Sequence, residues 1–175
     1  LLGWSLASDR DVFSLDEMIA AFDIADVNPN PARFDQKKAE AINGDHIRLL
    51  DADDFAARIV PYLSGAGFIA EEPSVEHRAL IAQAAPLVQE RVQLLGEVPG
   101  MLGFLFVSDV EYADDAMKGL PANASEVLTA SVRALEGVDD FTAAGVQEAL
   151  STALVDGLGL KPRVAYGPPR VALTG

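Results

Sequence analysis

Adjacent acidic residues are the first side chains in this sequence that could carry out acid–base chemistry. They form three pairs, Asp53-Asp54, Asp114-Asp115 and Asp139-Asp140. Each pair stands just before a helical pattern, where carboxylates complement the partial positive charge of a helix N-terminus. We therefore interpret the pairs as helix caps and solvated faces, and not as general acids and bases.

Other kinds of active-site residue are scarce. The two histidines, His46 and His77, are far apart in the sequence and leave little material for a zinc site. We interpret both as surface or partner-facing residues rather than catalytic ones. There is no cysteine, and no GxGxxG, GxSxG, HExxH or Walker-type phosphate loop. We expect no catalytic residue, no metal site and no cofactor within this chain.

Arginines are the side chains that suit nucleic-acid recognition, because a planar guanidinium both stacks and donates paired hydrogen bonds. Arg91 lies on a predicted helix, on the face opposite much of a leucine stripe, and Arg170 follows two prolines that fix the backbone before it. The alternatives are a surface arginine paired with Glu90 or Glu97, and an ordinary loop arginine. Weaker candidates for contacts with phosphates are Lys38, Arg48, Lys161 and Arg163.

The net charge of -14 argues against nucleic acid when taken alone, because phosphate binding relies on lysine and arginine. The charges are unevenly distributed, however. Residues 159–175 contain three basic residues and no acidic one. A basic surface can therefore form locally on an acidic body.

Helical patterns are predicted for the first part of the chain, which carries Lys38 and Arg48. Ser14 and Glu17 form a capping box before an apolar stripe that predicts a helix, and residues 28–31, Asn-Pro-Asn-Pro, predict a loop. A second helix is expected from about residue 34 to 42, capped by Asp35 and stopped by Asn43-Gly44. A third is expected to begin near Asp51 or Asp53, to be kinked by Pro61 and to end within residues 64–67.

The second half is patterned in the same way until residue 159. Ser74 caps a long helical segment that runs to Leu95 with a bend near Pro86, and two further helices are expected at 124–135 and 142–158. After Gly159 the proline-rich sequence favours an extended segment. No β-hairpin or internal repeat is evident, so the expected class is all-α, with a division near residues 65–73.

The composition is that of a globular domain, with half of the residues hydrophobic. No apolar run approaches the roughly 20 residues that a membrane helix needs, and no signal peptide is visible. The chain begins at Leu1, not methionine, and both ends are apolar. We therefore expect a soluble part of a longer polypeptide that does not bind membranes.

Five short motifs point to a known family. They are Leu2-Gly-Trp-Ser5, Phe13-Ser-Leu-Asp-Glu17, Phe34-Asp-Gln-Lys-Lys38, Ile42-Asn-Gly-Asp-His-Ile-Arg48 and Pro169-Arg-Val-Ala-Leu-Thr-Gly175. Their order and spacing resemble bacterial glutamyl-tRNA synthetase, in the part that follows its catalytic domain. Ala39, Ala41 and His46 stand where that family has leucine, an aromatic residue and tyrosine, which leaves fewer aromatic groups on this helix for RNA or core contacts.

The resemblance implies part of a class I synthetase that joins glutamate to its tRNA. Residues 1–64 would be a helical stem-contact region, and residues 65–175 an α-helical anticodon-binding bundle truncated at its C-terminal end. The family's HIGH-type and KMSKS-type motifs precede Leu1, so this chain should be inactive alone. Arg91 matches the arginine that reads an anticodon base and helps to distinguish glutamate tRNA from glutamine tRNA, and Arg170 matches an arginine near the anticodon.

For the parent enzyme the resemblance implies ATP and Mg as cofactors, a cytoplasmic location and a monomer. Its partner is glutamate tRNA, with charging of glutamine tRNA left open. The competing interpretation is an acidic helical protein-interaction module with no RNA role, which the charge of -14 suits better. An isolated enzyme is the third interpretation, and it fails because no active site is present.

Overall fold

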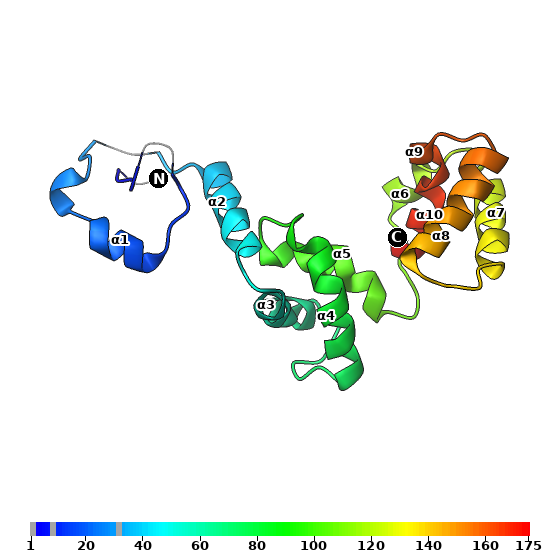
Figure 1. The fold of residues 1–175 in the computed structure, drawn as a ribbon, viewed down its shortest axis with the longest axis horizontal. Coiled ribbons are helices and arrows are strands. Elements are labelled where there is room, and N and C mark those ends of the chain that lie inside the picture. The colour runs from blue at the N-terminus through cyan, green and yellow to red at the C-terminus, as the bar shows by residue number, and fades with distance from the viewer. Residues whose placement is uncertain (1–2, 8–9, 31–32) are drawn as a thin grey trace. The chain divides into compact units, whose positions relative to one another are not determined.

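The computed structural model of this chain describes residues 3–7, 10–30 and 33–175, and its regular elements are helical (Figure 1). The described residues contain no β-strand and only an isolated bridge between Ala7 and Arg10, which confirms the expected all-α class. No helix among them is long and apolar enough to cross a membrane. The chain forms two compact units, Leu1–Phe106 and Val107–Gly175.

Helix α1, Leu15–Ala21, begins as the sequence predicts. The Ser14 hydroxyl accepts a hydrogen bond from the Glu17 amide at 3.1 Å, and the Glu17 carboxylate accepts one from the Ser14 amide at 2.8 Å. Both halves of the capping box are therefore present. The predicted loop at 28–31 is confirmed for residues 28–30, whereas Pro31 lies outside the described residues.

Helix α2, Gln36–Arg48, has Asp35 as its cap, as expected, but it does not stop at Asn43-Gly44. Gly44 does not adopt a left-handed conformation and is buried. A Cβ added at Gly44 would lie 3.2 Å from the Gln93 side chain and 3.3 Å from its Cα. This glycine therefore allows close packing against Gln93 and does not end the helix, which continues to Arg48. The buried Ile47 then anchors its last turn.

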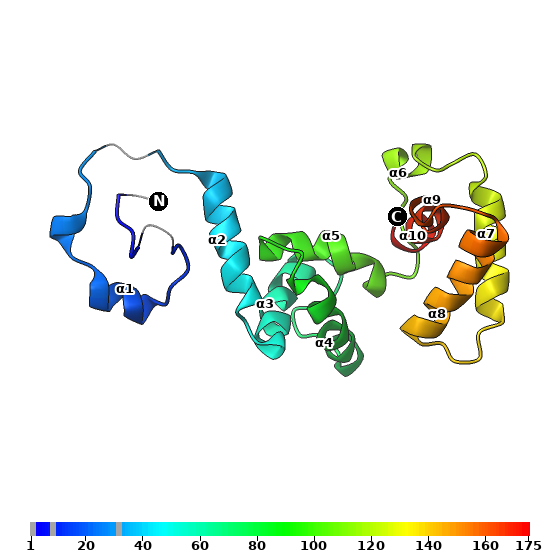
Figure 2. The same ribbon diagram turned by 45° about the horizontal axis from the view of Figure 1, so that its top comes forward.

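The core of the first unit is built by α3, Ala52–Gly65, α4, Val75–Gln89, and α5, Val98–Leu102 (Figure 2). Its fully buried side chains include Phe55, Ile59, Leu63, Ala85, Val92 and Val98. Residues on both sides of positions 64 and 65 belong to this one core, so the predicted boundary does not separate two compact units. The division of roles between 1–64 and 65–175 stays a prediction, while the structural division follows Phe106.

Helix α4 is capped by Ser74, as predicted, but ends at Gln89, so the expected continuation to Leu95 is wrong. Leu87 is 73% exposed, whereas Val92 is fully buried beyond the helix end. The chain thus leaves the helix after Gln89 and still buries Val92 in the turn that follows. Arg91 consequently lies in this turn and not on a helix face.

The second unit contains α6, Asp114–Lys118, α7, Ala124–Glu136, and α8, Ala143–Leu150, which continues as a π-helical segment, Ser151–Gly157. Two short helices follow, α9, Pro162–Ala165, and α10, Gly167–Thr174. The core is small and consists of Val127, Leu154 and Ala165 with partly buried neighbours. Helix α10 packs against α7 and α9.

The expectation of an extended segment after Gly159 is wrong. Pro162 and Pro168 each occupy the first turn of a helix, where a missing amide hydrogen costs nothing because that group has no partner within the helix. The burial of Ala165 and Pro168 then holds both helices on the unit. The prolines therefore start helices here instead of preventing them.

Candidate nucleic-acid interface

A groove of about 820 Å³ lies in the second unit, between α6 with the turn that follows it and the pair α9 and α10. Its lining residues are Ala116, Gly119, Leu120, Pro121, Pro162, Arg163, Val164, Tyr166, Gly167, Pro168, Arg170 and Val171. None of these residues is acidic, although the chain as a whole carries a charge of -14. The groove therefore combines cationic, aromatic and apolar groups on one surface.

The side chains of Arg163, Tyr166 and Arg170 line this groove, and backbone hydrogen bonds of helical spacing connect the end of α9 to the start of α10. The Tyr166 amide donates to the Pro162 carbonyl at 3.0 Å, and the Arg170 amide donates to the Tyr166 carbonyl at 3.2 Å. Arg163, Tyr166 and Arg170 are thus spaced by three and four residues, which places them on one helical face. An extended segment would have placed Arg163 on the side opposite to Tyr166 and Arg170.

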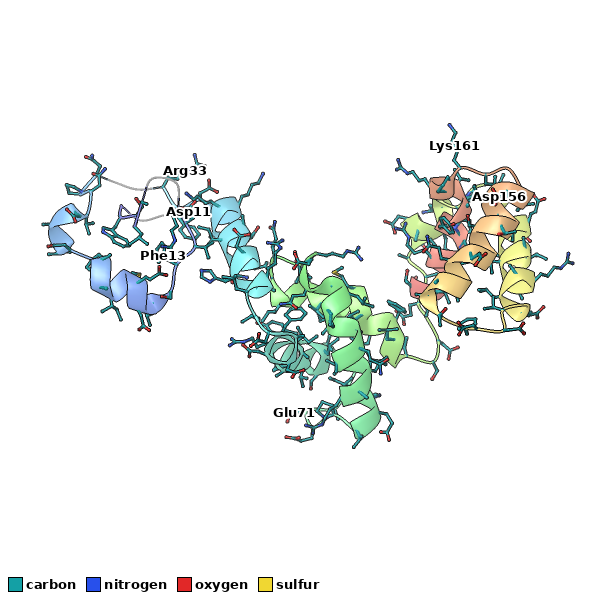
Figure 3. All side chains as sticks on the ribbon, viewed as in Figure 1. Asp11, Phe13, Arg33, Glu71, Asp156 and Lys161 are labelled. Carbon is teal, nitrogen blue, oxygen red and sulfur yellow. The ribbon has the colours of Figure 1, made fainter. Side chains whose placement is uncertain are left out.

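Arg163 and Arg170 are predicted from the sequence as binding residues, whereas Tyr166 is not. Tyr166 lies three residues after Arg163 and four before Arg170, so a helical period applied to this segment would have indicated it, whereas the extended period did not. Lys161, the residue before α9, is exposed, and Figure 3 shows its side chain projecting outward from the unit. It is not part of the groove lining.

Electrostatics distinguish the groove arginines from most other cations of the chain. Arg163 and Arg170 are exposed, and no ion pair within the second unit, all of which is described, involves either of them. Their guanidinium groups are therefore available for a ligand. An anionic, planar group such as a nucleotide matches both their charge and their geometry.

Arg91 lies in a turn that α2 and α4 hold in place. The buried Gln89 side chain donates to the Ile47 carbonyl at 2.9 Å and to the Leu50 carbonyl at 2.8 Å. Asn43 donates to the Gln93 carbonyl at 2.5 Å. The Arg91 backbone is thus fixed on both sides, which suits a residue that must present its side chain in one direction.

The carboxylates proposed as alternative partners for Arg91 are otherwise occupied. Glu97 accepts hydrogen bonds from the amides of Gln93 and Leu94 at 2.8 and 3.2 Å, and Glu90 lies 3.6 Å from the Nε of Arg48. Neither glutamate forms an ion pair with Arg91 among the described residues. The exposed Arg91 side chain therefore faces solvent.

Two of the weaker candidates have carboxylate partners. Lys38 Nζ lies 2.9 Å from an Asp11 oxygen, and Arg48 Nη1 lies 3.1 Å from Asp45. The Arg48 guanidinium also donates to the Glu90 carbonyl at 3.3 and 3.4 Å. These contacts give both residues a structural role that the sequence did not indicate.

The acidic pairs and the histidines form no site in the part of the chain that is described. Asp53 and Asp54 lie in the first turn of α3, where Asp54 is 2.9 Å from Arg58. His77 lies in the first turn of α4 with its ring edge-on to Phe106 at 5.5 Å. No group of three potential metal ligands is found among the described residues.

Together, the helical fold and the acid-free groove define an all-α module suited to the unstacked bases and phosphates of single-stranded nucleic acid. A family model described as the anticodon binding domain matches residues 54–175. The chain belongs to this family.

Relatives extend the match to the whole chain. A glutamate–tRNA ligase of Leifsonia xyli subsp. xyli is 63% identical, and one of Paenarthrobacter aurescens is 56% identical, each over 100% of this chain. The chain spans 36% and 35% of these two relatives. The resemblance to glutamyl-tRNA synthetases is therefore confirmed, and the protein-interaction interpretation is not favoured.

Solved structures agree on the fold. A glutamate tRNA ligase from Elizabethkingia meningosepticum superposes with a TM-score of 0.74 over 99% of this chain and 33% of that one, at 24% sequence identity. A glutamate-tRNA synthetase from Elizabethkingia anophelis gives a TM-score of 0.72. At this identity the likeness supports the fold alone.

Proposed function

We propose that this chain is the tRNA-binding part of a glutamate–tRNA ligase and recognises the anticodon side of glutamate tRNA. The observation that carries the proposal is the acid-free groove of an anticodon-binding family member, in which Arg163 and Arg170 have no carboxylate partner within the second unit, all of which is described. In the parent enzyme a separate catalytic domain would use ATP and Mg to attach glutamate. We place that enzyme in the cytoplasm as a monomer.

The groove can bind an anticodon loop by two complementary interactions. The loop presents unstacked bases whose edges accept and donate hydrogen bonds, and phosphates that need cations. Arg170, held within α10, presents a guanidinium that can donate two parallel hydrogen bonds to one base edge. Arg163, on the same helical face, supplies positive charge for a neighbouring phosphate.

The remaining cations would contact other parts of the tRNA. Arg91 is a second anticodon contact in the proposal, because its turn is fixed and its side chain is exposed. Lys161 is a contact to the RNA backbone beside α9. Lys38 and Arg48 are backbone contacts of the stem region, residues 1–64, and would have to exchange their present carboxylate partners for phosphates.

The test is a titration of glutamate tRNA against the full chain at two salt concentrations. Arg170→Ala is expected to weaken binding by about 1–3 kcal/mol, and Arg163→Ala to weaken it less and to reduce the salt dependence. Arg133→Ala is the matched control, since Arg133 is an exposed arginine of α7 outside the groove. Arg91→Ala should reduce the difference in affinity between glutamate and glutamine tRNA.

Two results would contradict the proposal. One is the absence of tRNA binding at low salt by a chain whose helical circular dichroism shows that it is folded. The other is an equal loss of affinity in Arg133→Ala and Arg170→Ala, because that would indicate attraction to charge anywhere on the surface and not to the groove.

A further inference from the structure

We propose that Tyr166 is the stacking platform of the groove and holds one unstacked base of the tRNA against its ring. The inference rests on the proposed function and adds a residue and a mode of contact to it. Tyr166 lies at the junction of α9 and α10, lines the groove and is half-buried. One part of its side chain therefore remains accessible from the groove.

The hydrophobic core of the second unit does not account for an aromatic residue at this position. Tyr166 is absent from the residues that form or flank the core of its unit, which are Val127, Ala130, Leu150, Ala153, Leu154, Val155, Leu158, Leu160 and Ala165. It takes part in the junction through its backbone amide and carbonyl, which any residue provides. The described structure shows no hydrogen bond from its hydroxyl group.

The surroundings of Tyr166 fit a nucleotide better than an apolar ligand. Arg163 and Arg170 lie one turn before and one turn after Tyr166 in the sequence and line the same groove, so the groove holds two cations together with the ring. The opposite side of the groove is formed by Leu120 and Pro121, which are apolar and uncharged. The volume of about 820 Å³ lies within the range of pockets that hold small molecules.

Tyr166, Arg163 and Arg170 have different roles in this arrangement. Stacking on an aromatic ring tolerates every base, because each base has a π-face, and it contributes about 1–3 kcal/mol per base. Hydrogen bonds from an arginine discriminate between bases. Tyr166 therefore sets affinity at the groove, and the arginines set register and selectivity.

The experiment compares Tyr166→Leu, which removes the ring but keeps an apolar side chain, with Tyr166→Phe, which keeps the ring. Binding to glutamate tRNA is measured for the full chain, together with thermal unfolding. Tyr166→Leu should weaken binding by about five- to one-hundred-fold, whereas Tyr166→Phe should stay within about twofold. Phe141→Leu is the matched control, since Phe141 is 69% exposed in the same unit and outside the groove.

A second arm removes the base instead of the ring. Glutamate tRNAs that each carry one abasic site in the anticodon loop are titrated against the unmodified chain and Tyr166→Leu. At one position the two proteins should bind equally, because the stacked base is already missing. This coupling would not arise if Tyr166 only supported the fold.

The outcomes separate this inference from the proposed function. If the unmodified chain binds tRNA but Tyr166→Leu binds equally tightly, stacking is wrong while the proposed function stands. Stacking is also wrong if Tyr166→Leu weakens every abasic tRNA by the same factor. A folded chain that binds no tRNA at all contradicts the proposed function itself.

Discussion

Ion pairing separates the basic side chains of this protein into two groups at the scale of single residues. Lys38 and Arg48 have carboxylates at 2.9 and 3.1 Å, whereas Arg163 and Arg170 have none within their unit. A paired cation must give up its carboxylate in order to bind a phosphate, so the net gain in free energy is only the difference between those two ion pairs. An unpaired exposed cation loses no partner. The acid-free groove thus matters more than the total charge of -14.

The capping box at Ser14 provides a residue-scale prediction of pH dependence. The backbone hydrogen bond from Ser14, and then the hydrogen bond from Arg10, lower the pKa of Glu17 below its ordinary value of 4.5. Because the folded state favours the ionised carboxylate, Glu17 adds to the free energy of unfolding at pH values above its pKa in the unfolded state. That contribution is lost as pH falls through the lower folded-state value.

The measurement is a side-chain NMR titration of Glu17 in the native chain and in Ser14→Ala. The native chain should give a pKa below 4.5, and Ser14→Ala should give a higher value than the native chain because the capping geometry is lost. A native pKa at or above 4.5 would show that the box does not form in solution.

At the scale of elements, the turn that carries Arg91 depends on hydrogen bonds between α2 and α4. Gln89 is buried and donates to two carbonyls at the end of α2, those of Ile47 and Leu50. Gln89→Leu keeps a similar volume but leaves both carbonyls without this donor. The Ile47 carbonyl still accepts from the Leu50 amide at 3.2 Å, so the Leu50 carbonyl is the group left unsatisfied, and we expect the free energy of unfolding to fall by about 1–3 kcal/mol.

Urea denaturation provides the measurement, and Gln83→Leu is the matched control. Gln83 lies on the same helix but is exposed, so the same chemical change there should alter stability by less than about 0.5 kcal/mol. Equal effects at the two positions would mean that the contact with α2 contributes nothing to stability.

At the scale of the whole molecule, the two units have separate hydrophobic cores. Leu154 is fully buried in the second unit, so Leu154→Ala should cost about 2–5 kcal/mol. Because no buried residue is shared with the first core, the loss of amide hydrogen-exchange protection should be confined to residues 107–175.

Hydrogen exchange followed by mass spectrometry resolves the two units. Leu173→Ala is the control, since Leu173 is 66% exposed and its truncation should leave protection unchanged. Ile59→Ala should give the reciprocal result, with loss confined to residues 1–106. Loss of protection throughout the chain in Leu154→Ala would show that the units unfold together.

The all-α class, the family and most helix starts follow from the amino-acid sequence without the fold. Caps such as Ser14, Asp35 and Ser74 act on amides two or three residues away, so their effect is readable without a fold. Arg163 and Arg170 were also selected from the sequence, through an acid-free segment and a family motif.

The ends of α2 and α4 and the fold of the last segment depend on tertiary contacts. Gly44 continues a helix because Gln93 packs against it, and the prolines after Gly159 start helices because Ala165 and Pro168 are buried. Tyr166 lines the groove because the segment around it folds into α9 and α10. These outcomes depend on contacts between distant residues, which local propensity does not contain, because burial outweighs a preference of a few tenths to about 1 kcal/mol per residue.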